Sequence, residues 1–153
     1  MKHGFIKVAA AAPEIRVADP MFNADAVIRA MDEHARLGVK VLVFPELTLT
    51  GATCGDLFYQ NTLLAGAAAA LEKVVKASEG KDMLVFVGLP VAQGAKVYDV
   101  AAAVCNGELL GVVPASCPGD KHFALPGALL DDIQIGSLGP VDFHPQQLFQ
   151  HSA

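Results

Sequence analysis

The sequence has 153 residues, is 53% apolar and carries a formal net charge of −5. This length and composition predict one compact α/β domain with a substantial core. The 11 lysine and arginine residues form no basic stripe, so nucleic acid binding is not expected. Strand-like sequence follows Met1 directly and no apolar run could span a bilayer, which predicts a cytoplasmic protein without membrane contact.

The first third of the sequence predicts a strand, a helix and a second strand. Asn23 is a candidate N-cap of the helix, and Gly38 is a candidate C-cap. Pro13 and Pro45 close the two strands, because proline has no backbone N–H to give to a sheet. The expected elements are a strand over 5–12, a helix over 23–37 and a strand over 39–44.

The middle of the sequence predicts two helices, a strand and a hairpin. Asn106-Gly107 lies between two apolar runs and is a strong signal for a two-residue hairpin turn. Pro90 is expected to end the preceding strand. The hairpin makes the predicted sheet mixed, with helices on one or both faces. The expected elements are a short helix over 56–60, a helix over 62–77, a strand over 83–89 and hairpin strands over 97–105 and 108–113.

Beyond Cys117, prolines and glycines interrupt the sequence and no periodicity is sustained. This composition predicts loop with at most short strands. A long irregular segment is unusual inside a compact domain, so we expect either an incomplete fold or a shortened functional loop.

Glu46 is the first candidate for chemistry, because it follows an apolar strand where no structural role requires a carboxylate. Ligands of open α/β sheets gather at the carboxyl ends of strands, so Glu46 is expected to be partly buried and to face a groove. Partial desolvation makes a carboxylate a better proton acceptor near neutral pH. The alternative is that Glu46 only caps the turn.

Other residue types that carry chemistry are scattered. The three cysteines, Cys54, Cys105 and Cys117, are odd in number and far apart, which indicates reduced thiols rather than disulfides or a zinc site. The five histidines show no ligand spacing, so no metal site is expected. A nucleotide-binding domain is the weakest alternative, because no G-x-G-x-x-G or Walker loop is present.

A series of short motifs runs from Lys7 to Pro114. They are Phe44-Pro45-Glu46-Leu47, Thr50-Gly51, Cys54-Gly55-Asp56-Leu57-Phe58, Val87-Gly88-Leu89-Pro90, Val97-Tyr98 and Cys105-Asn106-Gly107-Glu108-Leu109-Leu110-Gly111-Val112-Val113-Pro114. Their order and spacing resemble the amino-terminal half of a nitrilase-superfamily (carbon–nitrogen hydrolase) amidase domain. Within that superfamily they resemble the glutaminase domain of glutamine-dependent NAD synthetases.

The resemblance implies a nitrilase-like α-β-β-α sandwich, as an amino-terminal half or truncated form, with a Glu-Lys-Cys triad. Glu46 would be the general base, a cysteine would attack the amide of glutamine or another small amide, and a lysine would support the charged intermediate. The ammonia would serve NAD synthesis in a synthetase domain of the full protein. ATP and the NAD precursor would bind only there, so this domain is expected to hold no cofactor.

Two members of the implied triad have no clear equivalent. Ala115 stands where the family has its lysine, and Lys121 is the substitute candidate, against the alternative of a solvated loop lysine. The family's cysteine lies well beyond the hairpin, and Cys117 is the substitute candidate for the nucleophile. Asp99 stands where the family usually has asparagine, which affects substrate contacts.

Two functions of different class follow. The chain is either part of a glutamine amide hydrolase, without turnover by itself, or a catalytically silent relative kept as a binding or assembly module. We treat 1–153 as one incomplete carbon–nitrogen hydrolase (glutaminase) domain, with a recognisable sandwich portion over 1–114 and an irregular segment over 115–153. A half sandwich would leave an apolar sheet face bare, so we expect a homo-oligomer formed through this face or through the hairpin over 97–113.

Overall fold

The structure is a computed structural model that describes residues 4–126 and 132–143. Five strands form one sheet in the order β1-β2-β3-β4-β5, and β6 and β7 form a separate hairpin. The sheet contains β1 (Lys7–Ala10), β2 (Val39–Val43), β3 (Leu84–Gln93), β4 (Lys96–Cys105) and β5 (Glu108–Pro114). The other elements are α1 (Pro20–Arg36), the 3₁₀-helix η1 (Gly55–Tyr59), α2 (Asn61–Ala77), β6 (Ile133–Ile135) and β7 (Leu138–Val141).

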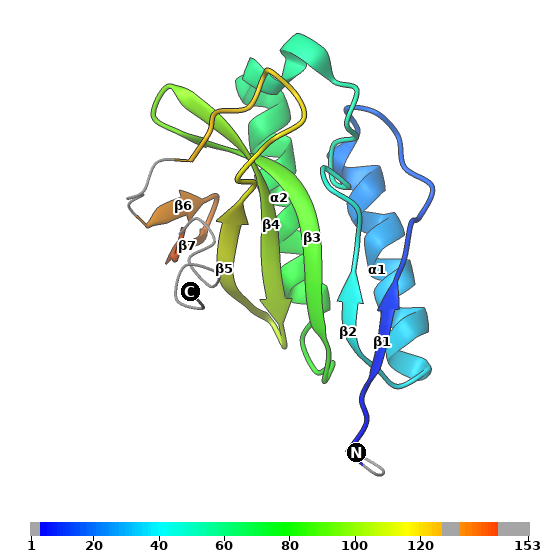
Figure 1. Ribbon diagram of the computed structural model, residues 1–153. Helices are drawn as coiled ribbons and strands as arrows, with labels where there is room; N and C mark the ends of the chain where they lie inside the picture. Colours follow the sequence, from blue (N-terminus) through cyan, green and yellow to red (C-terminus); the bar gives the residue numbers. More distant parts are fainter. Residues whose placement is uncertain (1–3, 127–131, 144–153) are drawn as a thin grey trace.

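The sheet and the helices form two layers. β1, β2 and β3 are parallel, whereas β4 is antiparallel to β3 and to β5, which confirms the predicted mixed sheet. α1 and α2 pack against each other and cover one face of the sheet (Figure 1). Successive side chains of a strand point to opposite faces, so every second residue joins the core beneath the helices. Leu42, Val87, Ala102 and Val112 are examples.

The opposite face of the sheet, which we call the outer face, is also apolar. The strand register places Val43 beside Phe86 and Ala101 beside Val113 on this face. On β1, Ala10 pairs with Val43, so Val8, two residues before Ala10, lies on the same face. Val8, Val43 and Val113 are 62%, 42% and 39% exposed. Part of the outer face is therefore open to solvent in the described structure.

The start of α1 differs from the prediction. Asp19, not Asn23, is the N-cap, and its side chain accepts a hydrogen bond from the N–H of Phe22 at 3.1 Å. Asn23 is buried and donates to the carbonyls of Arg16 and Leu49, at 2.8 and 3.1 Å, while its own side-chain oxygen accepts from the N–H of Arg16 at 2.7 Å. Asn23 therefore ties the loop before α1 to the loop after β2.

β3 is longer than predicted, because it continues through Pro90 instead of ending there. β2 pairs with β3 only as far as Phe86, so beyond that residue one edge of β3 has no partner strand. A proline at position 90 therefore removes no hydrogen bond between strands. The predicted hairpin turn is confirmed, since Asn106 and Gly107 have φ values of 45° and 81°.

The end of the described chain packs beside β5. Ile133, Ile135 and Phe143 are buried in the main core, and the N–H of Val112 donates to the carbonyl of Asp142 at 2.9 Å. The portions of the predicted irregular segment over 127–131 and 144–153 lie outside the described residues. Neither long helix in the described part of the chain combines the length and the hydropathy that a membrane span needs.

Candidate functional site

The segment after β2 is held firmly against β3. The N–H groups of Phe44 and Leu49 donate to the carbonyls of Phe86 and Gly88, at 2.9 and 3.1 Å. Glu46 lies between these two anchors, just beyond the carboxyl end of β2. Its backbone position is therefore fixed by β3 on both sides.

Gly88 allows this turn to approach β3 closely. A Cβ at position 88 would lie 2.4 Å from the backbone nitrogen of Leu47 and 2.8 Å from the Cα of Glu46. These separations are shorter than real Cβ contacts, so any larger residue would push the turn away from the strand. The glycine of the Val87-Gly88-Leu89-Pro90 motif thus sets the position of Glu46.

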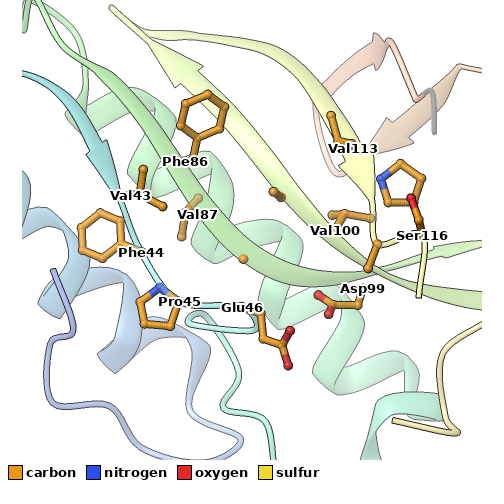
Figure 2. Close-up of a pocket in the computed structure, with 14 residues that line it drawn as sticks. Val43, Phe44, Pro45, Glu46, Phe86, Val87, Asp99, Val100, Val113 and Ser116 are labelled. Atoms are coloured by element: carbon orange, nitrogen blue, oxygen red, sulfur yellow. The ribbon is translucent and has the colours of Figure 1, made fainter. Parts of the chain in front are cut away.

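Glu46 lines a groove of about 270 Å³ at this end of the sheet (Figure 2). Its side walls are mostly apolar, and its polar side chains come from the turn after β2, from β4 and from the loop after β5. The lining residues are Val43, Phe44, Pro45, Glu46, Phe86, Val87, Gly88, Asp99, Val100, Ala101, Val113, Pro114, Ala115 and Ser116.

The predicted partial burial of Glu46 is wrong, because the residue is exposed at the rim of the groove. Its turn projects past the end of β2. Asp99, by contrast, lies within β4 between β3 and β5 and is 6% exposed. The groove therefore has one exposed and one buried carboxyl group.

The carboxyl group of Asp99 points toward the turn that carries Glu46 (Figure 2). Burial, and to a smaller extent the negative charge of Glu46, raise the pKa of Asp99 to about 7. Asp99 therefore titrates near neutral pH, so the groove becomes more negative as the pH rises through 7. The sequence identified Glu46 but did not predict its pairing with Asp99.

The structure does not bring Lys121 into the groove. Lys121 is exposed and is not among the lining residues. The adjacent His122 contacts Asp56 of η1 through Nε2 at 3.1 Å and Asp120 through Nδ1 at 2.5 Å. The hydroxyl of Tyr59 also donates to the carbonyl of His122 at 3.0 Å. Hydrogen bonding to Asp120, more than to Asp56, raises the pKa of His122.

None of the three cysteines lines the groove. Cys117 is exposed and follows Ser116, one of the lining residues. Cys54 is buried, and burial raises the pKa of its thiol, which is the opposite of what a nucleophile needs. Cys105 is partly buried at the end of β4. The lining thus provides a carboxylate base without a thiol, and Ala115 provides no ammonium group.

The sequence matches the carbon–nitrogen hydrolase family over residues 7–113. The glutamine-dependent NAD(+) synthetase of Mycobacterium tuberculosis is 35% identical over 115 residues, which are 75% of this chain and 17% of that protein. The synthetase of the same name from Xylella fastidiosa is 34% identical over 109 residues, which are 69% of this chain and 19% of that protein. The chain thus spans less than a fifth of the length of these relatives.

Solved structures share the fold. A glutamine-dependent NAD(+) synthetase from Cytophaga hutchinsonii superposes with a TM-score of 0.82 at 22% identity, over 91% of this chain and 25% of that one. An amidase from Nesterenkonia, solved as a variant in complex with butyramide, superposes with a TM-score of 0.66 at 19% identity, over 80% of this chain and 49% of that one. These likenesses confirm the predicted nitrilase-like α/β fold.

The family match covers most of the chain, and the motif that contains Glu46 lies inside it. The five-stranded sheet with a helix layer on one face agrees with the fold of the solved structures. The chain belongs to the carbon–nitrogen hydrolase family.

Proposed function

We propose that the groove binds a small primary amide and that Glu46 acts on it as the general base of an amide hydrolase. The observation that carries this proposal is the position of Glu46, which is fixed against β3 at the rim of a mostly apolar groove. A base in this position can take the proton of a nucleophile and return it to the leaving nitrogen.

Glutamine is the amide that we propose, because the related proteins are named glutamine-dependent NAD(+) synthetases. In this account the side-chain amide is hydrolysed and the ammonia serves NAD synthesis in a synthetase partner or domain, in the cytoplasm. The three free cysteines fit that reducing compartment.

The chain by itself is expected to bind the amide without turning it over. The described residues that line the groove include no thiol and no lysine, and both substitute candidates, Cys117 and Lys121, are exposed outside it. Because the described lining has no thiol and no lysine, we keep a second candidate function. It is a catalytically silent module for binding or assembly, in which Glu46 has no role in chemistry.

Three measurements on the purified chain test the proposal. Butyramide and glutamine are expected to bind, with a loss of affinity in Glu46→Gln. Ammonia release is expected to be absent, and mass spectrometry after treatment with a glutamine-like electrophile is expected to show no adduct. If neither amide binds, the silent module replaces the hydrolase. An adduct on Cys117 would instead identify that residue as a nucleophile and contradict the expected lack of turnover.

A further inference from the structure

Among the described residues, the groove is lined by two carboxyl groups and by no cationic side chain. Its polar side chains are those of Glu46, Asp99 and Ser116, and the other residues that line it are apolar. No lysine, arginine or histidine is among these lining residues. The chain as a whole is also negative, with a formal charge of −5, so its field attracts cations rather than anions.

The carboxyl of Asp99 receives no hydrogen bond from the described residues. The residue is 6% exposed and its carboxyl is directed into the groove (Figure 2). In the described residues, the interactions found for this carboxyl are burial and repulsion from Glu46, with no hydrogen-bond donor among them. Among the described residues, every fully buried side-chain nitrogen or oxygen atom has a hydrogen-bond partner. The Asp99 oxygens have none, so they are not fully buried and are open to the groove. A buried carboxyl without a donor is unfavourable, and a ligand that donates would relieve that cost.

We propose that this groove is a binding site for a primary alkylammonium ion, held between the carboxyl groups of Glu46 and Asp99. An ammonium group has three N–H donors and forms short, charge-assisted hydrogen bonds with carboxylates. The alkyl chain would lie along the apolar walls, which include Val43, Phe86 and Val113. The site thus offers charge at one end and apolar surface along its length.

A divalent metal ion fits this site less well. Calcium takes six to eight oxygen ligands and magnesium requires six in a strict octahedron. Within residues 4–126 and 132–143, no group of three or more potential metal-ligating side chains is found. A singly charged organic cation fits two carboxyl groups beside apolar walls better than a divalent metal ion does, because it needs fewer oxygen ligands and its alkyl chain can contact the walls.

Ammonium binding is coupled to the proton on Asp99. The pKa of Asp99 is about 7, so the carboxyl is mostly neutral at pH 6 and mostly ionised at pH 8. Because the ionised form attracts the cation, affinity is expected to rise about tenfold per pH unit below that pKa and to level off above it. Glu46 is the other titratable group among the residues that line the groove around Asp99.

This ligand class goes beyond the proposed amide hydrolysis and does not require it. n-Butylammonium and butyramide have similar length and a terminal nitrogen, but only the first is charged. If butyramide binds and n-butylammonium does not, the present inference fails and the amide proposal stands. The reverse result would reject the amide proposal alone.

Isothermal titration calorimetry of the full chain with n-butylammonium chloride tests the inference. Titrations at pH 6, 7 and 8, each in two buffers of different ionisation enthalpy, measure both affinity and released protons. We expect binding at pH 8, weakening by about fivefold from pH 7 to pH 6 because the ionised fraction of Asp99 falls by that factor, with release of a proton below pH 7. n-Butanol, the neutral analogue, is expected not to bind.

Variants test whether n-butylammonium binding depends on the two carboxyl groups of the groove or only on the negative charge of the whole chain. Asp99→Asn is expected to abolish proton release and to weaken binding by at least about tenfold, and Glu46→Gln is expected to weaken binding as well. Ala115→Lys, which places a tethered ammonium at the groove, is expected to abolish binding. Asp56→Asn removes an exposed carboxylate outside the groove and is expected to leave n-butylammonium binding unchanged.

Three results would overturn the inference. They are binding of n-butanol as tight as that of n-butylammonium, an affinity in Asp99→Asn equal to that of the unaltered chain, and binding of calcium chloride in place of n-butylammonium. Circular dichroism of each variant confirms that it is folded, and Ala115→Lys provides an independent test if Asp99→Asn fails to fold.

Discussion

Gly88 on β3 and Glu46 in the turn after β2 are in direct backbone contact, so closely that a Cβ on Gly88 would lie 2.8 Å from the Cα of Glu46. This contact brings the turn over the sheet at the place where Asp99 lies on the neighbouring strand β4. The turn that carries Glu46 can therefore lie close to Asp99, because Gly88 on the strand between them has no side chain.

Gly88→Ala is expected to displace the turn that carries Glu46. The added Cβ would meet backbone atoms rather than a flexible side chain, so the change is expected to cost about 1–3 kcal/mol of unfolding free energy. Binding of butyramide is expected to weaken with it. Gly119→Ala is the matched control, because a Cβ there meets nothing within 4 Å. Urea unfolding that shows equal stability for the two variants would contradict the contact.

The raised pKa of Asp99 predicts a decrease in stability as pH rises. The pKa is about 7 in the folded protein, compared with 3.8 for an ordinary aspartate, so between these values the folded state binds more protons than the unfolded state. Stability is then fully present below pH 4 for this group and is lost toward pH 7, by roughly 1 kcal/mol per pH unit. Because other groups titrate in the same range, the contribution of Asp99 is measured as the difference between the unaltered chain and Asp99→Asn.

Asp99→Asn is expected to remove this slope and to be more stable than the unaltered chain at pH 8. Glu46→Gln is expected to make the slope smaller, because it removes the neighbouring charge that contributes to the pKa of Asp99. Unfolding free energies measured from pH 5 to pH 8 test both. Parallel curves for all three proteins would show that Asp99 titrates normally.

His122 is expected to titrate above 6.5, because Asp120 and Asp56 stabilise its protonated form. Its raised pKa means that these contacts stabilise the fold below about pH 6.5 and that this contribution is lost as pH rises through the pKa of the folded state. NMR titration of the imidazole measures this value, and Asp56→Asn is expected to lower it. Asp82→Asn, which changes an exposed carboxylate paired with Lys40, serves as the control. A His122 pKa at or below 6.5 would mean that the pairing is absent in solution.

Self-association through the outer face remains a prediction. Val8 and Val43 are largely exposed there, and monomers rarely expose more than a few hundred Å² of contiguous apolar surface. We expect a symmetric dimer at tens of micromolar, its weakening in Val8→Lys, and competition between the dimer and ligands of the groove, because Val43 belongs to both surfaces. Leu57→Lys changes an equally apolar, exposed residue on η1 and is the control. Light scattering that finds a monomer of the unaltered chain would exclude this association.

The elements of the fold could be predicted because their signals are local. Apolar runs closed by Pro45 and a turn of Asn106-Gly107 depend on neighbours in the sequence, and both placed their strands correctly. Pro90 misled the prediction of β3 because its cost depends on whether a partner strand is adjacent, which is a property of the sheet.

The site was predictable only in part, for the same reason. The end of β2 placed Glu46 at a groove, but its exposure depends on which elements cover it. The pairing of Glu46 with Asp99 arises from the register of β3 and β4 and from Gly88, and no local pattern contains it. Asn23 similarly looked like a helix cap, although its buried amide joins two distant loops.

A crystal structure of the chain in complex with butyramide tests the amide site most directly. We expect the amide to occupy the groove, with its nitrogen or oxygen within hydrogen-bond distance of the Glu46 carboxylate and its alkyl chain against the wall formed by Phe86 and Val113. Butyramide bound elsewhere on the protein, or an empty groove at saturating butyramide, would contradict the claim that Glu46 belongs to an amide site.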